Sequence, residues 1–174
     1  MTQCDDIRRA ALEDLSTVND IVTAAVLGWP MAERLKRVAL RVLTYDAVDL
    51  REMEVLLAEV DGLPVGVAAW DPGAVLQGGG VRRGALLHGL YVVPEAQGCG
   101  IGAALQRRIA TRAAVAGCDA LVVKSERVSV GYFERCGYRR LADDALAGLE
   151  YPYLFALPVD QVVAIDRDPA GMVK

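Results

Sequence analysis

The chain has 174 residues and a formal net charge of -4 at pH 7, which is the length of one domain with a sizeable core. The acidic balance argues against nucleic acid as the main partner, because nucleic-acid-binding domains favour a basic face. The four cysteines show no C-x-x-C spacing and there is a single histidine, so neither a disulfide framework nor a metal site is expected, and free thiols favour the cytoplasm.

The first half of the sequence alternates between strand and helix patterns. A short strand is expected at residues 6–10. Two amphipathic helices follow, one from Glu13 with its apolar stripe starting at Leu15, and one from about Ala32 that fades by Asp49. We interpret the two stripes as core packing, with Trp29 and Tyr45 as candidates for lining a pocket.

Two strands at residues 54–60 and 65–70 flank Asp61-Gly62, which is a strong hairpin signal. Asp71-Pro72-Gly73 is expected to end the second strand, and residues 77–80 read as a flexible loop. A further strand is expected at residues 86–93, ending before Pro94. No apolar run reaches about 18 residues and residues 1–10 are polar, so neither a membrane span nor a signal peptide is expected.

A helix with apolar residues at Ile101, Leu105 and Ile109 follows a glycine-rich turn, and Gly117 is suited to its C-cap. The remaining elements are a buried strand at 120–123, a short helix at 128–136 and strands at 138–141 and 151–157. Residues 159–174 read as a tail outside a core of about residues 5–158. The order predicts a single α/β domain, residues 1–174. Its mostly antiparallel sheet has a parallel strand-helix-strand core and helices on both faces.

The turn at residues 97–102, Gln-Gly-Cys-Gly-Ile-Gly, opens the helix and predicts an anion site, because backbone N–H groups there lack helical partners. The glycine spacing does not match the dinucleotide fingerprint G-x-G-x-x-G, and no lysine follows as in a P-loop. It does match [QR]-x-x-G-x-[GA] directly after a strand that ends at proline.

At this point the chain resembles the GNAT superfamily of N-acetyltransferases. Residues 90–105 look like the family's core motif throughout, and residues 132–138, Tyr-Phe-Glu-Arg-Cys-Gly-Tyr, resemble its aromatic-E-[KR]-x-G-[FY] segment. The resemblance implies acetyl-CoA as the donor, with no metal. It implies a donor site of backbone groups for the pantetheine arm and the pyrophosphate, from Leu90, Tyr91, Val92, Gln97, Gly98, Cys99, Gly100, Ile101, Gly102 and Ala103. Side chains at the three glycines are expected to block close approach.

The family transfers the acetyl group directly to an amine, which requires a base, a polarised carbonyl and an acid for the leaving thiolate. The backbone N–H near Val92 is the group that the family would use against the carbonyl. The family's acid tyrosine falls on Phe133, which cannot donate a proton, so Tyr132 is the candidate acid or else a packed aromatic. Seven residues before Phe133, where the family often has an asparagine that contacts the pantetheine arm, this chain has Glu126.

His88 is the candidate base, because an unperturbed imidazole titrates near neutral pH and the residue lies on the strand leading into the donor site. A packed, hydrogen-bonded histidine is the alternative. The rival bases are Glu59 and Asp71, and Glu54 and Glu126 are weaker candidates.

The sequence therefore predicts a cytoplasmic N-acetyltransferase for a primary amine on a small molecule or peptide, without nucleic acid or membrane as partner. A homodimer stays open. The alternative is an acyl-CoA sensor or an inactive member of the same fold, which the missing tyrosine motivates.

Overall fold

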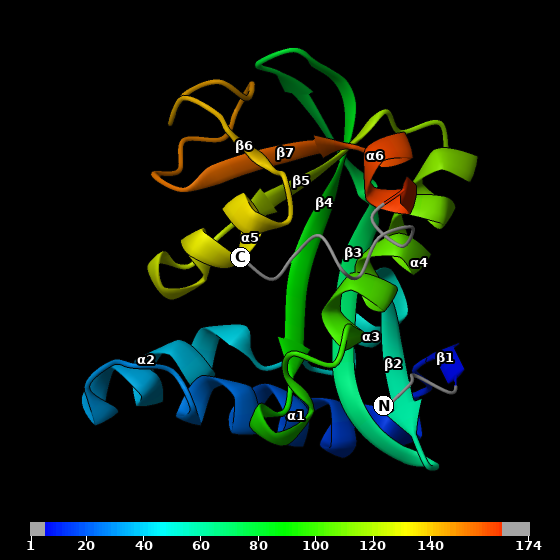
Figure 1. The fold of residues 1–174 in the computed structure, drawn as a ribbon, viewed down its shortest axis with the longest axis vertical. Helices are drawn as coiled ribbons and strands as arrows, with labels where there is room; N and C mark the ends of the chain where they lie inside the picture. Colours follow the sequence, from blue (N-terminus) through cyan, green and yellow to red (C-terminus); the bar gives the residue numbers. More distant parts are fainter. Residues whose placement is uncertain (1–5, 165–174) are drawn as a thin grey trace. The chain divides into compact units, whose positions relative to one another are not determined.

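The computed structural model describes residues 6–164 of the chain. Within them, seven strands form one sheet in the order β1-β2-β3-β4-β5-β7-β6 (Figure 1). The strands are β1 Asp6–Arg9, β2 Glu54–Val60, β3 Leu63–Gly78, β4 Val81–Val92, β5 Ala120–Lys124, β6 Arg139–Arg140 and β7 Leu154–Pro158. The helices are α1 Leu15–Leu27, α2 Glu33–Leu43, α3 Asp49–Glu52, α4 Ile101–Val115, α5 Val130–Arg135 and α6 Val159–Ala164.

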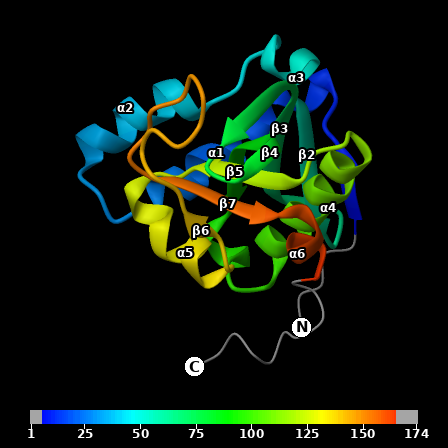
Figure 2. The same cartoon turned by 90° about the horizontal axis from the view of Figure 1, so that it is seen from above.

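The sheet is mixed. β4 and β5 pair in parallel, joined by the crossover helix α4, whereas β1–β2, β2–β3, β5–β7 and β6–β7 pair antiparallel (Figure 2). This confirms the predicted mixed sheet with a parallel strand-helix-strand core. The described residues group into two compact units, the first up to Trp70 with Gly89–Gln106 and the second Asp71–His88 with the residues from Arg107 on.

In the first unit, helices cover both faces of the sheet. Side chains of α1 pack on the face that carries Leu57 of β2 and Val67 of β3, two residues that pair across the strands. The neighbouring Gly66 faces the other way, because side chains alternate along a strand. A Cβ placed on Gly66 would meet Ile101 and Leu105 of α4, so the start of α4 lies directly on this glycine.

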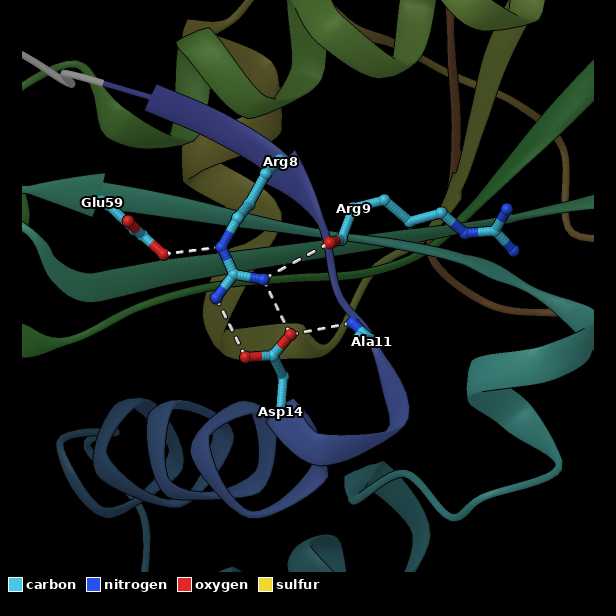
Figure 3. Close-up of polar contacts among 5 residues, drawn as sticks. All are labelled: Arg8, Arg9, Ala11, Asp14 and Glu59. Atoms are coloured by element: carbon cyan, nitrogen blue, oxygen red, sulfur yellow. Dashed lines mark hydrogen bonds and ion pairs between the residues drawn. The ribbon is translucent and has the colours of Figure 1, made fainter.

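An ion network ties the first strand to its neighbours (Figure 3). Arg8 of β1 donates to both carboxylate oxygens of Asp14 at 2.7 and 2.9 Å and to Glu59 of β2 at 2.8 Å. Asp14 also accepts the backbone N–H of Ala11 at 2.8 Å, as a cap for the turn that leads into α1. Hydrogen bonding from Arg8 lowers the pKa of Asp14 to about 2, below its ordinary value of 3.8.

In the second unit, β4 pairs with β5 from Gly84↔Ala120 to Leu87↔Val123, and β5 pairs in turn with β7. Asp119 fixes the start of this ladder, because its carboxylate accepts the backbone N–H groups of Arg82 and Arg83 at 3.1 and 2.9 Å.

Three expectations about the elements were wrong. β3 does not end at Asp71-Pro72-Gly73 but runs to Gly78, since its ladder with β2 ends at Trp70 and the missing N–H of Pro72 interrupts no bond on that side. Residues 77–80 are not a flexible loop. Gly79 and Gly80, both with positive φ, form the hairpin turn into β4, which begins at Val81.

The third error concerns the helices. The second helix, α2, ends at Leu43, earlier than the expected fading by Asp49, and the short α3 begins at Asp49. The expected tail begins with α6, in which Val162 is buried. Tyr45, a candidate for lining a pocket, is buried in the core cluster of the first unit. Residues 165–174 and the cysteine at position 4 lie outside the described residues.

Candidate functional site

The glycine turn connects β4 to α4 with a defined backbone. A single 3-10 turn, Pro94–Ala96, follows β4, and α4 begins at Ile101. Gly98 and Gly100 have φ of 76° and 80°, a left-handed conformation that favours glycine. The side-chain amide of Gln97 donates to the carbonyl oxygen of Val92 at 3.0 Å and so holds the turn against the end of the strand.

The positive φ adds a second reason for the glycines, besides the expected close approach of a ligand. A Cβ on Gly98 or on Gly100 would meet no atom of the protein within 4 Å. In this chain the two glycines are therefore required for the direction of the backbone, and the space beside each of them is open. Both residues are exposed.

Backbone donors gather at the start of α4. Ala104 donates to the carbonyl of Gly100 at 3.0 Å, which is the first bond between the helix and the turn. The N–H groups of Ile101, Gly102 and Ala103 precede this bond and have no acceptor within the helix. Together with the positive end of the helix dipole they favour an anion. The side chain of Ile101 is buried, so the first turn is anchored to the core.

The last residues of β4 lead directly into this turn. β4 continues to Val92, five residues beyond the end of its ladder with β5 at Leu87. Tyr91 is buried in the core cluster next to α1, whereas Leu90 and Val92 are half-buried. Leu90, Tyr91 and Val92 therefore carry backbone groups immediately before the glycine turn, and the ten residues of the predicted donor site all lie in the first unit.

His88 lies on β4 and its side chain is exposed. It alternates with Gly89, whose Cβ position faces Tyr45 and Tyr91 in the core, so His88 lies on the opposite face of the strand. The side chain has an interaction within the protein. An exposed imidazole on the strand that leads into the donor turn is suited to proton transfer with a bound molecule.

An aromatic cluster surrounds the position where the family's acid tyrosine would fall. Phe133 of α5 is 5% exposed, and its ring centroid lies 5.2 Å from Tyr132, 5.3 Å from Tyr138 and 6.4 Å from Phe155. Burial raises the pKa of Tyr138 well above its ordinary value, so it stays protonated. Phe133 is thus a packing residue, while Tyr132 is half-buried at the edge of the cluster.

The rival bases have partners within the protein. Glu59 pairs with Arg8, and the buried Glu54 accepts from the indole nitrogen of Trp70 at 2.9 Å. Asp71 accepts the backbone N–H two residues on at 2.8 Å. The fourth candidate, Glu126, has Tyr151 as its partner. Burial of Tyr151, followed by the charge of Glu126 and its hydrogen bond, raises the pKa of the Tyr151 hydroxyl. Each of these carboxylates is engaged in a local contact.

Two further properties of residues 6–164 concern metal ions and membranes. No group of three or more His, Cys, Asp or Glu side chains could hold a metal ion. None of the helices found in this part of the chain is long and apolar enough to cross a bilayer. Cys99, Cys118 and Cys136 are free thiols.

Residues 20–138 match the family model described as the acetyltransferase (GNAT) family, which is more than half of the chain. The chain belongs to this family. The resemblance inferred from the two motifs is confirmed, and so is the fold that it implied. A comparison with curated proteins gives no match.

Solved structures share the GNAT fold at low identity. A GCN5-related N-acetyltransferase from Rhodopseudomonas palustris is 18% identical with a TM-score of 0.70, covering 91% of this chain and 98% of that one. PaiA N-acetyltransferase from Thermoplasma acidophilum, solved with coenzyme A, is 20% identical with a TM-score of 0.68, covering 88% and 98%. The ribosomal-protein-S18-alanine N-acetyltransferase from Escherichia coli is 17% identical with a TM-score of 0.56, covering 88% and 93%.

Sequence reasoning missed two residues that lie against candidate site residues of this GNAT chain, Gly66 against Ile101 and Tyr151 against Glu126. Gly66 supports the first turn of α4, and a signal was present, because a glycine inside an apolar strand often marks the close approach of another element. Tyr151, the neighbour of Glu126, carried no signal. It follows the acidic loop, and only the fold brings it to the end of β5.

Proposed function

We propose that this protein is an acetyl-CoA-dependent N-acetyltransferase that acts on a primary amine. The observation that carries the proposal is the turn between β4 and α4. Its left-handed glycines leave the backbone open, and the first N–H groups of α4 have no helical acceptors. Acetyl-CoA supplies a pyrophosphate that suits such donors and an activated acetyl thioester.

The protein's own groups divide the binding between two backbone segments. Gln97, Gly98, Cys99, Gly100, Ile101, Gly102 and Ala103 would hold the pyrophosphate through main-chain N–H groups. Leu90, Tyr91 and Val92 would offer backbone groups to the pantetheine arm. The exposure of the glycines and the buried anchor at Ile101 support this division, because an anchored turn with an open outer side is preorganised for a ligand.

The chemistry requires two proton movements. His88 would accept the proton that the attacking amine loses as the N–C bond forms, and the backbone N–H near Val92 would stabilise the oxyanion. As the C–S bond breaks, Tyr132 would donate to the leaving sulfur. A thiol has an ordinary pKa near 8.5, so the acid contributes less here than it would for an alkoxide.

The proposal also covers the acceptor, the domain organisation, the location and the oligomeric state. The acceptor is a small molecule or a peptide, and the S18-alanine acetyltransferase of the same fold is a relative that acts on a protein. A single domain, residues 1–174, is part of the proposal, and it is supported by β3 and β4, each of which contributes residues to both units. We propose the cytoplasm as the location. Sedimentation measurements would decide whether the protein forms a homodimer.

A second function has its own support. Phe133 is packed among aromatic rings and supplies no hydroxyl, which favours an acyl-CoA sensor or an inactive member. One measurement tests the donor site that both functions share, and a second separates the two functions. Acetyl-CoA at 100 times its dissociation constant should stabilise the fold by about 2.7 kcal/mol in either case. Release of CoA thiol with a panel of amines is expected only of the enzyme.

Gly100→Ala tests the donor site directly, with Gly117→Ala as its matched control. Both glycines have nearly the same φ, 80° and 81°, and at neither would a Cβ meet any atom within 4 Å. Each substitution should therefore cost a similar amount, about 1 kcal/mol of stability. We expect only Gly100→Ala to weaken acetyl-CoA binding in calorimetry. Equal binding by both variants would remove the turn from the donor site.

The catalytic roles need kinetic variants. We expect His88→Gln to lower kcat and to remove the acidic limb of its pH profile, while acetyl-CoA binding stays unchanged. Tyr132→Phe should lower kcat by about tenfold or more if this hydroxyl is the acid. An unchanged kcat in both variants, with acetyl transfer intact, would leave the proposed function standing and assign the proton transfers to other groups.

A further inference from the structure

The outer face of α2 carries two rows of exposed side chains side by side. Leu35, Val38 and Val42 are 47%, 58% and 76% exposed and recur at the spacing of one helix face. On the inner side, Ala39, Leu40 and Leu43 pack against the core cluster of the first unit. The apolar sector of α2 is therefore wider than the core uses.

A row of arginines runs along the flank of the exposed apolar row. Arg34, Arg37 and Arg41 share its spacing, and a step of about 100° per residue places the two rows next to each other. All three side chains are exposed, and among residues 6–164 the structure joins none of them to a carboxylate. We call the two rows together the outer face of α2.

Lys36, on the same helix, is a cation with a structural role, in contrast to the three arginines. It is 8% exposed and turned inward, where its ammonium donates to the carbonyl of Leu27 at 2.7 Å and to Glu33 at 2.9 Å. It thus satisfies the last carbonyl of α1. The three arginines have no comparable role within the protein, and α2 packs on α1, its neighbour in Figure 1.

The charge of this helix is opposite to that of the chain. Residues 33–43 hold four basic side chains and one acidic one, within a protein of net charge -4. A partner that covers the exposed apolar row would place its own flanking groups against the arginines. Carboxylates there would be attracted, and lysines or arginines would be repelled.

We propose that the outer face of α2 binds an acidic amphipathic helix of a partner protein. The partner's apolar side chains would pack between Leu35, Val38 and Val42, and its carboxylates would pair with the arginine row. Helix-on-helix docking suits a straight row at i, i+3 and i+7. This interaction is separate from acetyl transfer and does not depend on the proposed function.

Two other occupants fit less well. A bilayer surface favours long apolar and aromatic side chains, whereas two of the three exposed residues here are valines and the arginines lie on one flank only. A second copy of α2, packed antiparallel about a two-fold axis, would bring both arginine rows onto the same side of the interface. Repulsion between the rows opposes that dimer.

The probe is a synthetic peptide of alanine, leucine and glutamate, long enough to be helical, with leucines at i, i+3 and i+7 and glutamates in the adjacent row. Its fluorescein-labelled form is titrated with the full-length protein and followed by anisotropy. We expect saturable binding that weakens as salt is raised. R34Q/R37Q/R41Q and L35S/V38S/V42S should each weaken it by about tenfold or more.

Matched controls remove the same side chains elsewhere. R9Q/R51Q/R83Q takes away three exposed arginines, and L63S/V75S/V115S three exposed apolar residues, outside α2. Both should bind the peptide within about twofold of the unchanged protein. The lysine-for-glutamate version of the peptide should not bind.

Several results would overturn the proposal. These are no peptide binding, equal binding of the lysine peptide, or equal loss in the control variants. Binding to phosphatidylserine vesicles that the α2 variants abolish, with no peptide binding, would assign the face to a membrane. Sedimentation showing a dimer that the α2 variants dissociate, again without peptide binding, would assign it to a second copy.

Discussion

Gly66→Ala should weaken CoA binding although Gly66 belongs to no part of the predicted donor site. Its added Cβ would lie 2.9 Å from Cγ2 of Ile101 and 3.1 Å from Cδ1 of Leu105, both on the first turns of α4. Carbon atoms in contact prefer about 3.5–4.0 Å, so the helix start must move by several tenths of an ångström. Because Ile101 begins the helix, that movement displaces the N–H groups proposed to hold the pyrophosphate.

The size of the effect follows from packing. Overpacking by one methyl group costs about 1–3 kcal/mol, and we expect the lower half of this range because both facing atoms are side-chain methyl groups. Binding should weaken by about five- to tenfold, since the donors shift without being lost. Calorimetric titration with CoA gives the affinity, and urea unfolding of the same variant gives the stability.

Gly84→Ala is the matched control. Its Cβ would be crowded to a similar degree, at 2.7 Å from Val122 and 2.9 Å from Val81, but these residues lie on β5 and β4 in the second unit. We expect a similar loss of stability with unchanged CoA affinity. If both variants lost affinity equally, the effect would be one of general destabilisation. If Gly66→Ala bound CoA normally while losing stability, the link from Gly66 to the donor turn would be refuted.

Two further predictions concern the fold. Arg8 holds the pKa of Asp14 near 2, so the pair's stabilisation is present above the unfolded value of 3.8 and is lost as pH falls towards 2. Asp14→Asn should therefore cost about 1 kcal/mol at pH 6, allowing for solvent screening, and almost nothing at pH 2, as measured by urea unfolding. Gly89→Ala would place its Cβ near the hydroxyl of Tyr45 and 2.7 Å from Tyr91. It should cost about 2 kcal/mol, and Tyr45→Phe should recover about half of that; strict additivity would contradict the contact.

The sequence predicted the elements whose signals are local. The hairpin at Asp61-Gly62 joins β2 and β3, and Asp61 has the positive φ that such a turn requires. The stripe of α1 is buried as its spacing indicated. The extent of β3 was missed, because Pro72 is a strand breaker only where a ladder needs its N–H, and the end of β2 decides that.

The same distinction applies to the candidate site. A donor site made of backbone groups requires particular glycines, a strand before them and a helix after them, and all of these can be recognised in a sequence. Catalysis and acceptor choice depend on side chains that the fold brings together from separate segments. Glu126 and Tyr151 meet only through the pairing of β5 with β7, and the inward turn of Lys36 is set by the carbonyl of Leu27. The donor site is thus the part of the proposed reaction that a sequence can predict.

The position of Phe133 shows why the missing hydroxyl does not by itself decide between enzyme and sensor. Its ring is packed against Tyr138 and Phe155, so the aromatic shape is required by the core of the second unit whether or not a hydroxyl is attached. Loss of the hydroxyl there leaves the fold intact and removes only one proton donor. Since a thiolate is a fair leaving group, its departure depends less on an acid than deprotonation of the amine depends on a base. The proposed base, His88, is therefore the residue on which the difference between the two proposed functions depends most.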